Sequence, residues 1–370
     1  NIVFSQNRGQ NIKLKQPTAE SMKAGAFIDV NAAGYAESNY NITQLVKDVL
    51  IAGGSTCTTA NVSNVNVSPN LPTTDQNRSW GYFNKAGTNF PFSKGIVLVT
   101  GFARKAGNNF QSVLSDPLPS GGDVDLATAL NVNNANLRDA TYIEFDFVPS
   151  STEVSFRYLF ASKEYSPSGT FTCSIADGFA LLLKKVGDPT YTNLAVLPNG
   201  AGPVSVTNII PSGLACGPKN AQYFAGMNNP QVETNFDGRT VPLTAKATVI
   251  PGETYHFKMV LADYQDVNFD SAVFLEAGSF DIGVQILGPG GVALPPSINM
   301  CDNTPQVLTA SIQNATASYQ WFLNNTPIAG ATNATYTATQ PGVYTLQVLL
   351  AGNTCPGTAT VTIVGGTSPT

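Results

Sequence analysis

Apolar and polar residues alternate in short segments along most of the chain. In the segment 141–148, Ile143 and Phe145 alternate with Glu144 and Asp146. Because successive side chains of a β-strand point to opposite faces, this pattern predicts a strand with one buried and one solvated face. Other segments rich in aromatic or β-branched residues, separated by Pro, Gly, Asn and Asp, predict strands at 95–101, 153–160, 178–183, 254–261 and 271–276.

One segment near the start has helical spacing instead. Apolar residues within 41–51 recur at intervals of three and four, which places them on one stripe of a helix. Asn41 or Thr43 can cap its first turn, and Gly53 with Gly54 is a stop signal. The sequence therefore predicts an all-β fold, a jelly-roll or β-sandwich large domain with one short helix near its start.

A change in composition divides the chain. The segment 287–296 is rich in Gly and Pro, which is typical of a linker. The strand-like segments after it, with turn residues every eight to twelve positions, are typical of an immunoglobulin-like β-sandwich. We predict an N-terminal extension at 1–38, a β-sandwich domain at 39–284, a linker at 285–296, an immunoglobulin-like domain at 297–366 and a linker or tail at 367–370.

Uncharged polar residues dominate the expected surface. Charged residues make up only 12% of the chain, its net charge is -5 and its isoelectric point is about 4.9. Asn, Thr, Ser and Gly take the polar positions, as is common in secreted β-proteins. No cluster of Lys and Arg offers a basic field for phosphates, which excludes nucleic acid as a partner. No apolar run could span a bilayer, so we expect an extracellular or outer-surface protein without a transmembrane segment, exported through a removed signal peptide.

The 5 cysteines lie far apart, and none of their spacings matches a metal-binding motif. In a secreted protein this favours disulfides. Cys301 and Cys355 flank the C-terminal domain and are predicted to pair. Cys173 and Cys216 are the second predicted pair, so Cys57 is expected to have a free thiol.

Acidic residues gather in several loops and strand ends. Ca²⁺ takes six to eight oxygen ligands, and secreted β-proteins often supply them from such loops. The candidate calcium ligands are Asp123, Asp125, Glu164, Asp177, Asp263, Asp266 and Asp270. Asp123 and Asp125 are expected on one side of an extended segment. The alternative, that these acids form turns by accepting hydrogen bonds from backbone N–H groups, stays open at this point.

Catalytic chemistry has little support in the sequence. His256 is the only histidine of the chain, and it lies in the middle of a predicted strand, where we expect a structural role. A Ser-His-Asp or Cys-His system would have to use it. Carboxylate pairs can hydrolyse glycosides without histidine, but no pair is singled out. Trp80, Tyr82 and Phe83 can line a sugar platform or pack in the core, and we favour the core. We predict that the protein is not an enzyme.

A series of motifs in the large domain occurs in the order of a known family. The motifs are Gln44–Gly54, Gly81–Phe83, Gly95–Gly101, Gly122–Leu126, Glu144–Pro149, Phe156–Tyr165, Asp177–Leu183, Asn193–Pro198, Asp237–Ala245 and Asp270–Phe280. Between residues 39 and 283 the chain thereby resembles the choice-of-anchor L domain of exported bacterial proteins. Lys163 departs from the pattern, which usually has an acidic residue before Glu164. The resemblance implies export and surface display, frequently by type IX secretion in Bacteroidetes, and no established enzyme activity.

The C-terminal domain resembles the immunoglobulin/PKD-like modules of Bacteroidetes surface proteins, through the segment 319–348. This likeness implies that Trp321 is the core aromatic residue and that Tyr344 packs or hydrogen-bonds near a strand corner. Cys355 comes eleven residues after Tyr344 rather than two, so an antibody-type disulfide is not expected.

These observations predict a non-enzymatic, exported cell-surface protein that acts in adhesion, surface display or extracellular assembly. An alternative is a subunit of an extracellular filament, joined through its C-terminal module or through strand-like parts of its N-terminal extension, 11–15 or 25–30. A second alternative is a carbohydrate-binding or carbohydrate-active protein. The expected partners are other surface proteins, copies of the same chain, or surface glycans.

Overall fold

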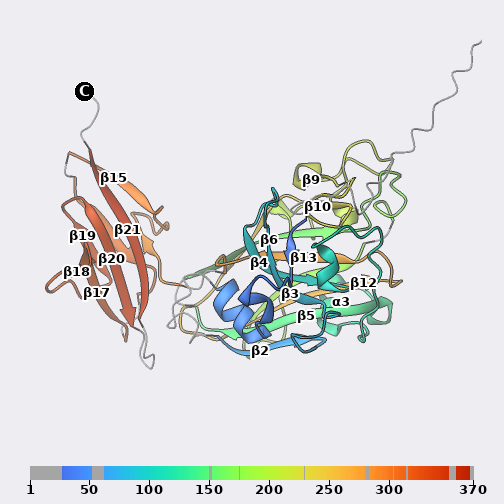
Figure 1. Ribbon diagram of the computed structural model, residues 1–370. Helices are drawn as coiled ribbons and strands as arrows, with labels where there is room; N and C mark the ends of the chain where they lie inside the picture. The colour runs from blue at the N-terminus through green and yellow to red at the C-terminus, as the bar shows by residue number, and fades with distance from the viewer. Residues whose placement is uncertain are drawn as a thin grey trace, which may run out of the picture.

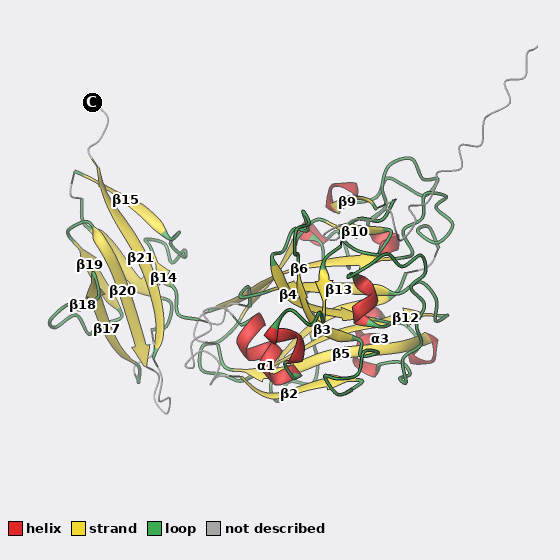
Figure 2. Ribbon diagram, in the orientation of Figure 1, coloured by secondary structure: helices red, strands yellow, loops and turns green. Residues whose placement is uncertain are grey.

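The computed structural model describes residues 27–51, 62–149, 152–174, 176–228, 230–280, 283–302, 304–313, 316–349 and 356–366. Two bodies of packed sheets follow one another along the chain, which we call the large domain (27–280) and the C-terminal unit (283–366) (Figure 1). Strands form most of the regular secondary structure of both bodies, long loops connect them, and the helices are short (Figure 2). The predicted all-β fold is confirmed.

The large domain consists of two antiparallel sheets. The first has the spatial order β1 (Asp29–Val30), β3 (Trp80–Asn84), β4 (Lys94–Val99), β13 (Ser271–Glu276), β6 (Glu153–Ser162), β10 (Gly238–Thr240) and β9 (Phe224–Met227), with β11 (Leu243–Thr248) also paired to β6. The second has the order β2 (Val62–Ser68), β5 (Leu137–Phe147), β12 (Tyr255–Tyr264), β7 (Gly178–Lys185) and β8 (Thr192–Asn193).

Alternating side chains build the core between these sheets. Ile143, Phe145 and Phe147 of β5 are buried, whereas Glu144 and Asp146 between them are only partly buried. The buried residues of β5 share one apolar cluster with inward-facing residues of β6, β12 and β13. The predicted period of two is therefore confirmed in the strand where it was clearest.

The first sheet is buried on both faces. In β4, Leu98 joins the core between the sheets, whereas Val97 and Val99 join a second cluster on the opposite face. The loop residues Phe90 and Phe92 cover that second cluster. Burial on both faces explains why β4 is a continuous apolar run in the sequence instead of an alternating one.

The predicted helix is present, and a second one was missed. Asn41 Oδ1 accepts a hydrogen bond from Gln44 N, and Gln44 Oε1 accepts one from Asn41 N, which forms a capping box. The helix begins as α1 (Ile42–Gln44) and continues in wider π-helical turns as η3 (Leu45–Leu50). The second helix, α3 (Val124–Leu130), covers apolar residues on the outer face of β7 and β12. Shorter 3₁₀ turns are η2 (Ala36–Asn39), η4 (Ala103–Ala106), η5 (Asn134–Asn136), η6 (Pro198–Gly200), η7 (Val206–Asn208) and η8 (Ala221–Tyr223).

The large domain begins before residue 39, which corrects the predicted extension at 1–38. Strand β1 pairs with β3, and Phe27, Ile28 and Val30 are buried in the domain itself. These side chains were counted as extension because a two-residue strand has too little sequence pattern to recognise. Two segments of the predicted extension, 11–15 and 25–30, were considered as strands that could pair with a neighbouring molecule. Within the second segment, the residues from 27 onward pack in their own large domain. The first segment lies outside the described residues.

The C-terminal unit is a sandwich of two sheets. One has the order β14 (Ile286–Leu287), β16 (Gln306–Ala310) and β19 (Thr335–Ala338), and the other β15 (Ser297–Cys301), β21 (Gly357–Gly366), β20 (Gly342–Leu349), β17 (Ser318–Leu323) and β18 (Thr326–Pro327). Strand β14 pairs with β16, and Ile286 lies in this core. The first residues of the predicted linker at 285–296 therefore belong to the C-terminal unit. The Gly and Pro residues that indicated a linker form a turn directly after β14.

Trp321 and Tyr344 hold the positions expected of them. Trp321 is fully buried and its indole Nε1 donates to Asn333 O at 2.9 Å. Tyr344 is fully buried, and its hydroxyl donates to Gln340 O at 2.8 Å, four residues earlier. A tyrosine that ties back to the chain just before its own strand fixes that strand's entry into the sheet.

Replacing Tyr344 by phenylalanine is expected to lower the local stability of the C-terminal unit by about 1 kcal/mol, because one buried hydrogen bond is lost while the ring stays. Hydrogen exchange of the backbone amides of β20 measures this change. Amides of β12 in the large domain are the internal control and should exchange as before. Unchanged protection in β20 would show that the hydroxyl does not stabilise the corner.

One predicted disulfide is confirmed. Cys173 and Cys216 are bonded, 43 residues apart in sequence. The predicted bond between Cys301 and Cys355 is not supported, because Cys301 carries a free, exposed thiol. The parallel pairing of β15 with β21 places Cys301 beside Gly366, at the opposite end of β21 from Gly357. Cys355 and Cys57 themselves lie outside the described residues.

Candidate functional site

Four aspartates from separate segments meet at one edge of the large domain, and we call them the aspartate cluster: Asp116, Asp139, Asp263 and Asp270. Asp263 lies near the end of β12, opposite Arg138 of β5, which brings it beside Asp139. Asp270 immediately precedes β13 and accepts a hydrogen bond at Oδ1 from the backbone N–H of Asp116 at 3.3 Å. Asp139 accepts one at Oδ1 from the N–H of Leu118 at 3.0 Å.

The cluster has more buried oxygens than donors. Asp139, Asp263 and Asp270 are buried, and Asp263 and Asp270 are each only 1% exposed. Both carboxylate oxygens of Asp263, and one each of Asp116, Asp139 and Asp270, have no hydrogen-bond partner among the described residues. Burial raises the pKa of Asp263, and the nearby hydroxyl of Thr100 offsets a part of this rise. The two groups do not form a hydrogen bond of normal geometry. Buried carboxylates without partners are costly to keep ionised.

Burial and mutual repulsion raise the pKa values of these groups. Burial is the largest cause for Asp270, and the charge of Asp116 adds to it, so its pKa rises to about 7. The pKa of Asp263 is raised well above its ordinary range by burial, with the charges of Asp270 and Asp139 adding to the effect. Burial also raises the pKa of Asp139. These three groups therefore act on one another electrostatically.

Glu164 and Asp177 form a second acidic pair next to the cluster. Glu164 Oε2 accepts a hydrogen bond from the backbone N–H of Asp177 at 3.2 Å. Asp177 in turn accepts bonds from the hydroxyl of Ser271 at 2.5 Å and from the N–H of Tyr264 at 3.3 Å. Burial raises the pKa of Glu164 to about 7, and burial with the charges of Asp263 and Glu164 raises that of Asp177. Ser271 and Tyr264 follow Asp270 and Asp263 directly in sequence, so the pair borders the cluster.

Asp123 and Asp125 do not join this group. Asp123 caps helix α3 by accepting the N–H of Leu126 at 2.9 Å, and Asp125 lies in the first helical turn. The prediction of an extended segment at Asp123 and Asp125 is wrong. An aspartate whose carboxylate accepts the backbone N–H of the third residue after it caps a helix, and α3 begins directly after Asp123. Lys258 of β12 donates to both carboxylates at 2.7 Å and supplies the positive charge between them.

Asp266 also lies apart from the cluster. Its Oδ1 accepts the backbone N–H of Asn268 at 2.8 Å, as in a turn. Its charge still raises the pKa of Glu164, which places it near the acidic pair. Within the described ranges, no three acidic, histidine or cysteine side chains are arranged to hold a metal ion by themselves.

His256 takes part in a different polar network, on the outer face of the second sheet. Its Nδ1 lies 2.7 Å from Asp146 Oδ1, and its Nε2 lies 3.6 Å from Glu144 Oε2. Lys184 lies opposite on β7, with its amine over the ring of Tyr191. Both ring nitrogens of the single histidine therefore face carboxylates, which supports its predicted structural role.

The pKa of His256 is expected above 6.5, because the hydrogen bond with Glu144 and that with Asp146 favour the charged ring more than burial opposes it. A raised pKa in the folded state means that His256 stabilises the fold below pH 6.5 and loses this effect as the pH rises through its folded pKa. As the only histidine, it gives a single Cε1–H resonance that can be titrated by NMR. Asp146→Asn should lower the midpoint, and a parent midpoint below 6.5 would contradict the expectation.

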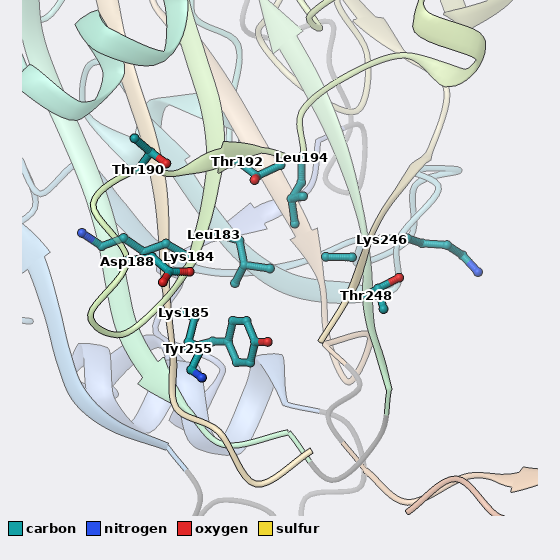
Figure 3. Close-up of a pocket in the computed structure, with 11 residues that line it drawn as sticks. Leu183, Lys184, Lys185, Asp188, Thr190, Thr192, Leu194, Lys246, Thr248 and Tyr255 are labelled. Atoms are coloured by element: carbon teal, nitrogen blue, oxygen red, sulfur yellow. The ribbon is translucent and has the colours of Figure 1, made fainter. Parts of the chain in front are cut away.

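A pocket of about 390 Å³ opens between β7, β8 and β11 (Figure 3). Its lining is mixed: Leu183, Lys184, Lys185, Asp188, Thr190, Thr192, Leu194, Lys246, Ala247, Thr248 and Tyr255. Lys185 pairs with Glu253 at 3.1 Å, and Lys246, which points away from Tyr255 in Figure 3, pairs with Glu153 at 3.0 Å. Hydroxyls and amines of this kind suit a polar ligand.

The aromatic residues considered as a sugar platform are not available for one. Trp80, Tyr82 and Phe83 are each at most 2% exposed, and they pack in the two apolar clusters of the first sheet. The preferred interpretation, core packing, is confirmed.

The sequence profile of the choice-of-anchor L domain family matches residues 30–281. The chain belongs to this family. The match covers the large domain from β1 to Phe280, including the aspartate cluster, and confirms the resemblance found in the motifs. No curated protein matches the chain.

Solved structures share only distant similarity with this choice-of-anchor L protein. The adhesin domain of Epf from Streptococcus pyogenes is 6% identical over 62% of this chain and 74% of that chain, with a TM-score of 0.19. A β-1,2-glucanase from Parabacteroides distasonis (9% identity, 88% and 39% coverage, TM-score 0.20) and a putative membrane anchored protein from Corynebacterium diphtheriae (8%, 82% and 57%, 0.16) are similarly remote. The chain spans 39% of the length of the glucanase and 57% of the length of the membrane anchored protein. At these TM-scores the likenesses carry no argument.

Sequence reasoning found part of the site of this choice-of-anchor L domain. It named Asp263 and Asp270, together with Glu164 and Asp177 beside them, but it missed Asp116, Asp139 and the cation Lys258. Asp139 lies inside β5 with a φ of 51°, in the left-handed region that Asp and Asn tolerate best. An aspartate at a position that the alternation of β5 assigns to the buried face is the one signal that could have indicated it.

Proposed function

We propose that this choice-of-anchor L protein is a non-enzymatic, exported surface protein that acts in adhesion or surface display. The observation that carries the proposal is the family match across residues 30–281, which implies display rather than catalysis. His256 is engaged by Glu144 and Asp146, which is consistent with a non-catalytic role. No helix within the described part of the chain is long and apolar enough to cross a membrane.

Adhesion is tested with beads that carry the full chain, measured for retention under flow. Surfaces of glycan arrays, of host-cell proteins and of the same chain represent the three classes of expected partner. Retention on one class above uncoated beads supports adhesion and identifies the partner. A panel of glycoside substrates runs in parallel, with Glu164→Gln and Asp177→Asn as controls. Turnover that these variants abolish, without retention on any surface, would overturn the proposal in favour of an enzyme.

The route to the surface is proposed from the family as well. Export through a removed signal peptide, by type IX secretion, predicts that the protein is found at the outer surface of its native cells. Cell fractionation with surface proteolysis tests the location, and deletion of the secretion machinery tests the route. Retention of the protein inside wild-type cells would contradict both.

Assembly into a filament is the second proposed function, and the structure sharpens its test. Because residues from 27 onward pack in the large domain itself, a deletion should remove only 1–26. If a segment in 1–26 adds to a neighbour's sheet, this deletion abolishes polymers seen by electron microscopy and leaves the monomer folded. Polymers that persist would exclude strand donation from this segment.

A further inference from the structure

We propose that the aspartate cluster binds a divalent cation, Ca²⁺ in preference to Mg²⁺, at the edge of the large domain where β5 and β12 meet the loop before β13. The proposal is independent of the adhesion proposal. It also replaces the set of candidate ligands from the sequence with a smaller one: Asp263, Asp270, Asp139 and Asp116.

The strongest support is an excess of acceptors in a buried place. Nine buried side-chain oxygens or nitrogens of the described residues lack a hydrogen-bond partner, and five of them are carboxylate oxygens of these four aspartates. Native proteins leave few buried polar atoms unsatisfied, so such a concentration needs an explanation. Asp263 is the extreme case, with both oxygens unpartnered at 1% exposure. A bound cation would satisfy these oxygens together.

The negative charge in the cluster is compensated only in part. Lys105 pairs with Asp116 at 2.6 Å, and its charge reaches Asp270 only as a minor influence. Arg138 lowers the pKa of Asp139 less than burial raises it. Asp263 has no ion pair with a described Lys, Arg or His. By contrast, the acids Asp123 and Asp125 already have Lys258 between them. The fold thus neutralises Asp123 and Asp125 with Lys258, whereas Asp139, Asp263 and Asp270 have no ion pair with a described residue.

The backbone around Asp270 is shaped for its carboxylate. A Cβ atom at Gly101 would lie 2.0 Å from Asp270 Oδ2, so only glycine lets the carboxylate occupy that space. The hydroxyl of Thr100 and the backbone beside it border the same side of the cluster, since Ser271 N donates to Thr100 Oγ1 at 3.0 Å. Carboxylate, hydroxyl and carbonyl oxygens are the ligands of hard cations, whereas zinc and copper sites favour nitrogen or sulfur.

The spread of the ligands favours calcium over magnesium. The four aspartates come from four segments, and within the described chain no three acidic, histidine or cysteine side chains are placed to hold a metal ion as they stand, so a cation has to draw the carboxylates together. Ca²⁺ accepts irregular coordination by six to eight oxygens, including hydroxyls, carbonyls and water, whereas Mg²⁺ requires a near-ideal octahedron. We infer that Ca²⁺ draws the carboxylates of Asp263 and Asp270 together and completes its shell with Asp139, Asp116 and neighbouring neutral oxygens.

The experiment uses the full chain freed of metal by a chelating resin. Ca²⁺ and Mg²⁺ are added separately while binding heat and the melting temperature are measured at pH 8. At about a hundredfold excess over its Kd, Ca²⁺ should raise the Tm of the large domain by about 5 to 10 °C, and equal Mg²⁺ should raise it less. In Asp263→Asn with Asp270→Asn, which keep the side-chain shapes, both the heat and the shift should disappear.

Asp266→Asn is the matched control, because it removes an acid from the same loop while an asparagine can still form the turn. It should retain the Ca²⁺ shift. The double variant in chelator should melt at or above the parent, since repulsion in the cluster is relieved, and this shows that it folds. The proposal is overturned if Ca²⁺ gives neither heat nor shift in the parent, which would mean that the aspartates share protons instead. It is also overturned if the double variant keeps the shift.

Discussion

Replacing Phe280 by alanine is expected to lower the free energy of unfolding of the large domain by about 3 to 5 kcal/mol. The ring of Phe280 is fully buried and contacts four other aromatic rings, at centroid distances of 5.0 to 5.4 Å: those of Phe145, Phe147, Phe156 and Phe257. These rings come from both sheets, so the vacated space cannot be filled by movement of a single strand. Urea denaturation followed by far-ultraviolet circular dichroism measures the loss.

Phe171 is the matched control for this variant. It also contacts another ring, that of Phe269 at 4.7 Å, but it is only half-buried in a loop. Phe171→Ala should therefore cost clearly less than Phe280→Ala, because little of the cavity term applies at a site that solvent can reach. Equal losses in the two variants would show that Phe280 does not hold the sheets together.

Replacing Cys173 and Cys216 by serine is expected to destabilise the large domain by up to about 4 kcal/mol, from the entropy of a closed loop of this length. The bond closes a loop of 43 residues that contains all of β7 and β8. Losing it gives the unfolded chain more freedom and leaves the folded sheets intact. Thermal unfolding of the double variant and of the parent, each with and without reductant, measures the effect.

Cys301→Ser is the control for the thiol chemistry, because Cys301 is exposed and free. This variant should unfold like the parent in either condition. Reductant should destabilise the parent and leave the Cys173/Cys216 double variant unchanged. A parent that is insensitive to reductant, once the thiols are shown by mass to be reduced, would contradict the expected role of the bond.

Much of the fold could be predicted because it depends on local pattern. The alternation of Ile143 and Phe145 with Glu144 and Asp146 gave the strand and its buried face, and Asn41 gave the start of the helix. Short elements were missed for the opposite reason. Strand β1 and strand β14 have two residues each, too few for a period, and they were assigned to an extension and a linker.

The site depends on contacts that no local pattern contains. Asp263 and Asp139 are neighbours only because β12 pairs with β5, and Asp116 reaches Asp270 across 154 residues of sequence. Asp123 and Asp125 looked equally suited as cation ligands until the fold placed Lys258 between them. A sequence can show that acids are plentiful in loops, but the pairing of distant strands decides which of them share a charge.

The parallel pairing of β15 with β21 has a mechanical consequence. Opposite pulls on the first residue of β15, Ser297, and on the last of β21, Gly366, act along the strands in opposite directions and load their five register pairs at once. Antiparallel ends pulled apart would instead open one pair at a time. Under such a load this contact must therefore slide along its full length before the two strands separate.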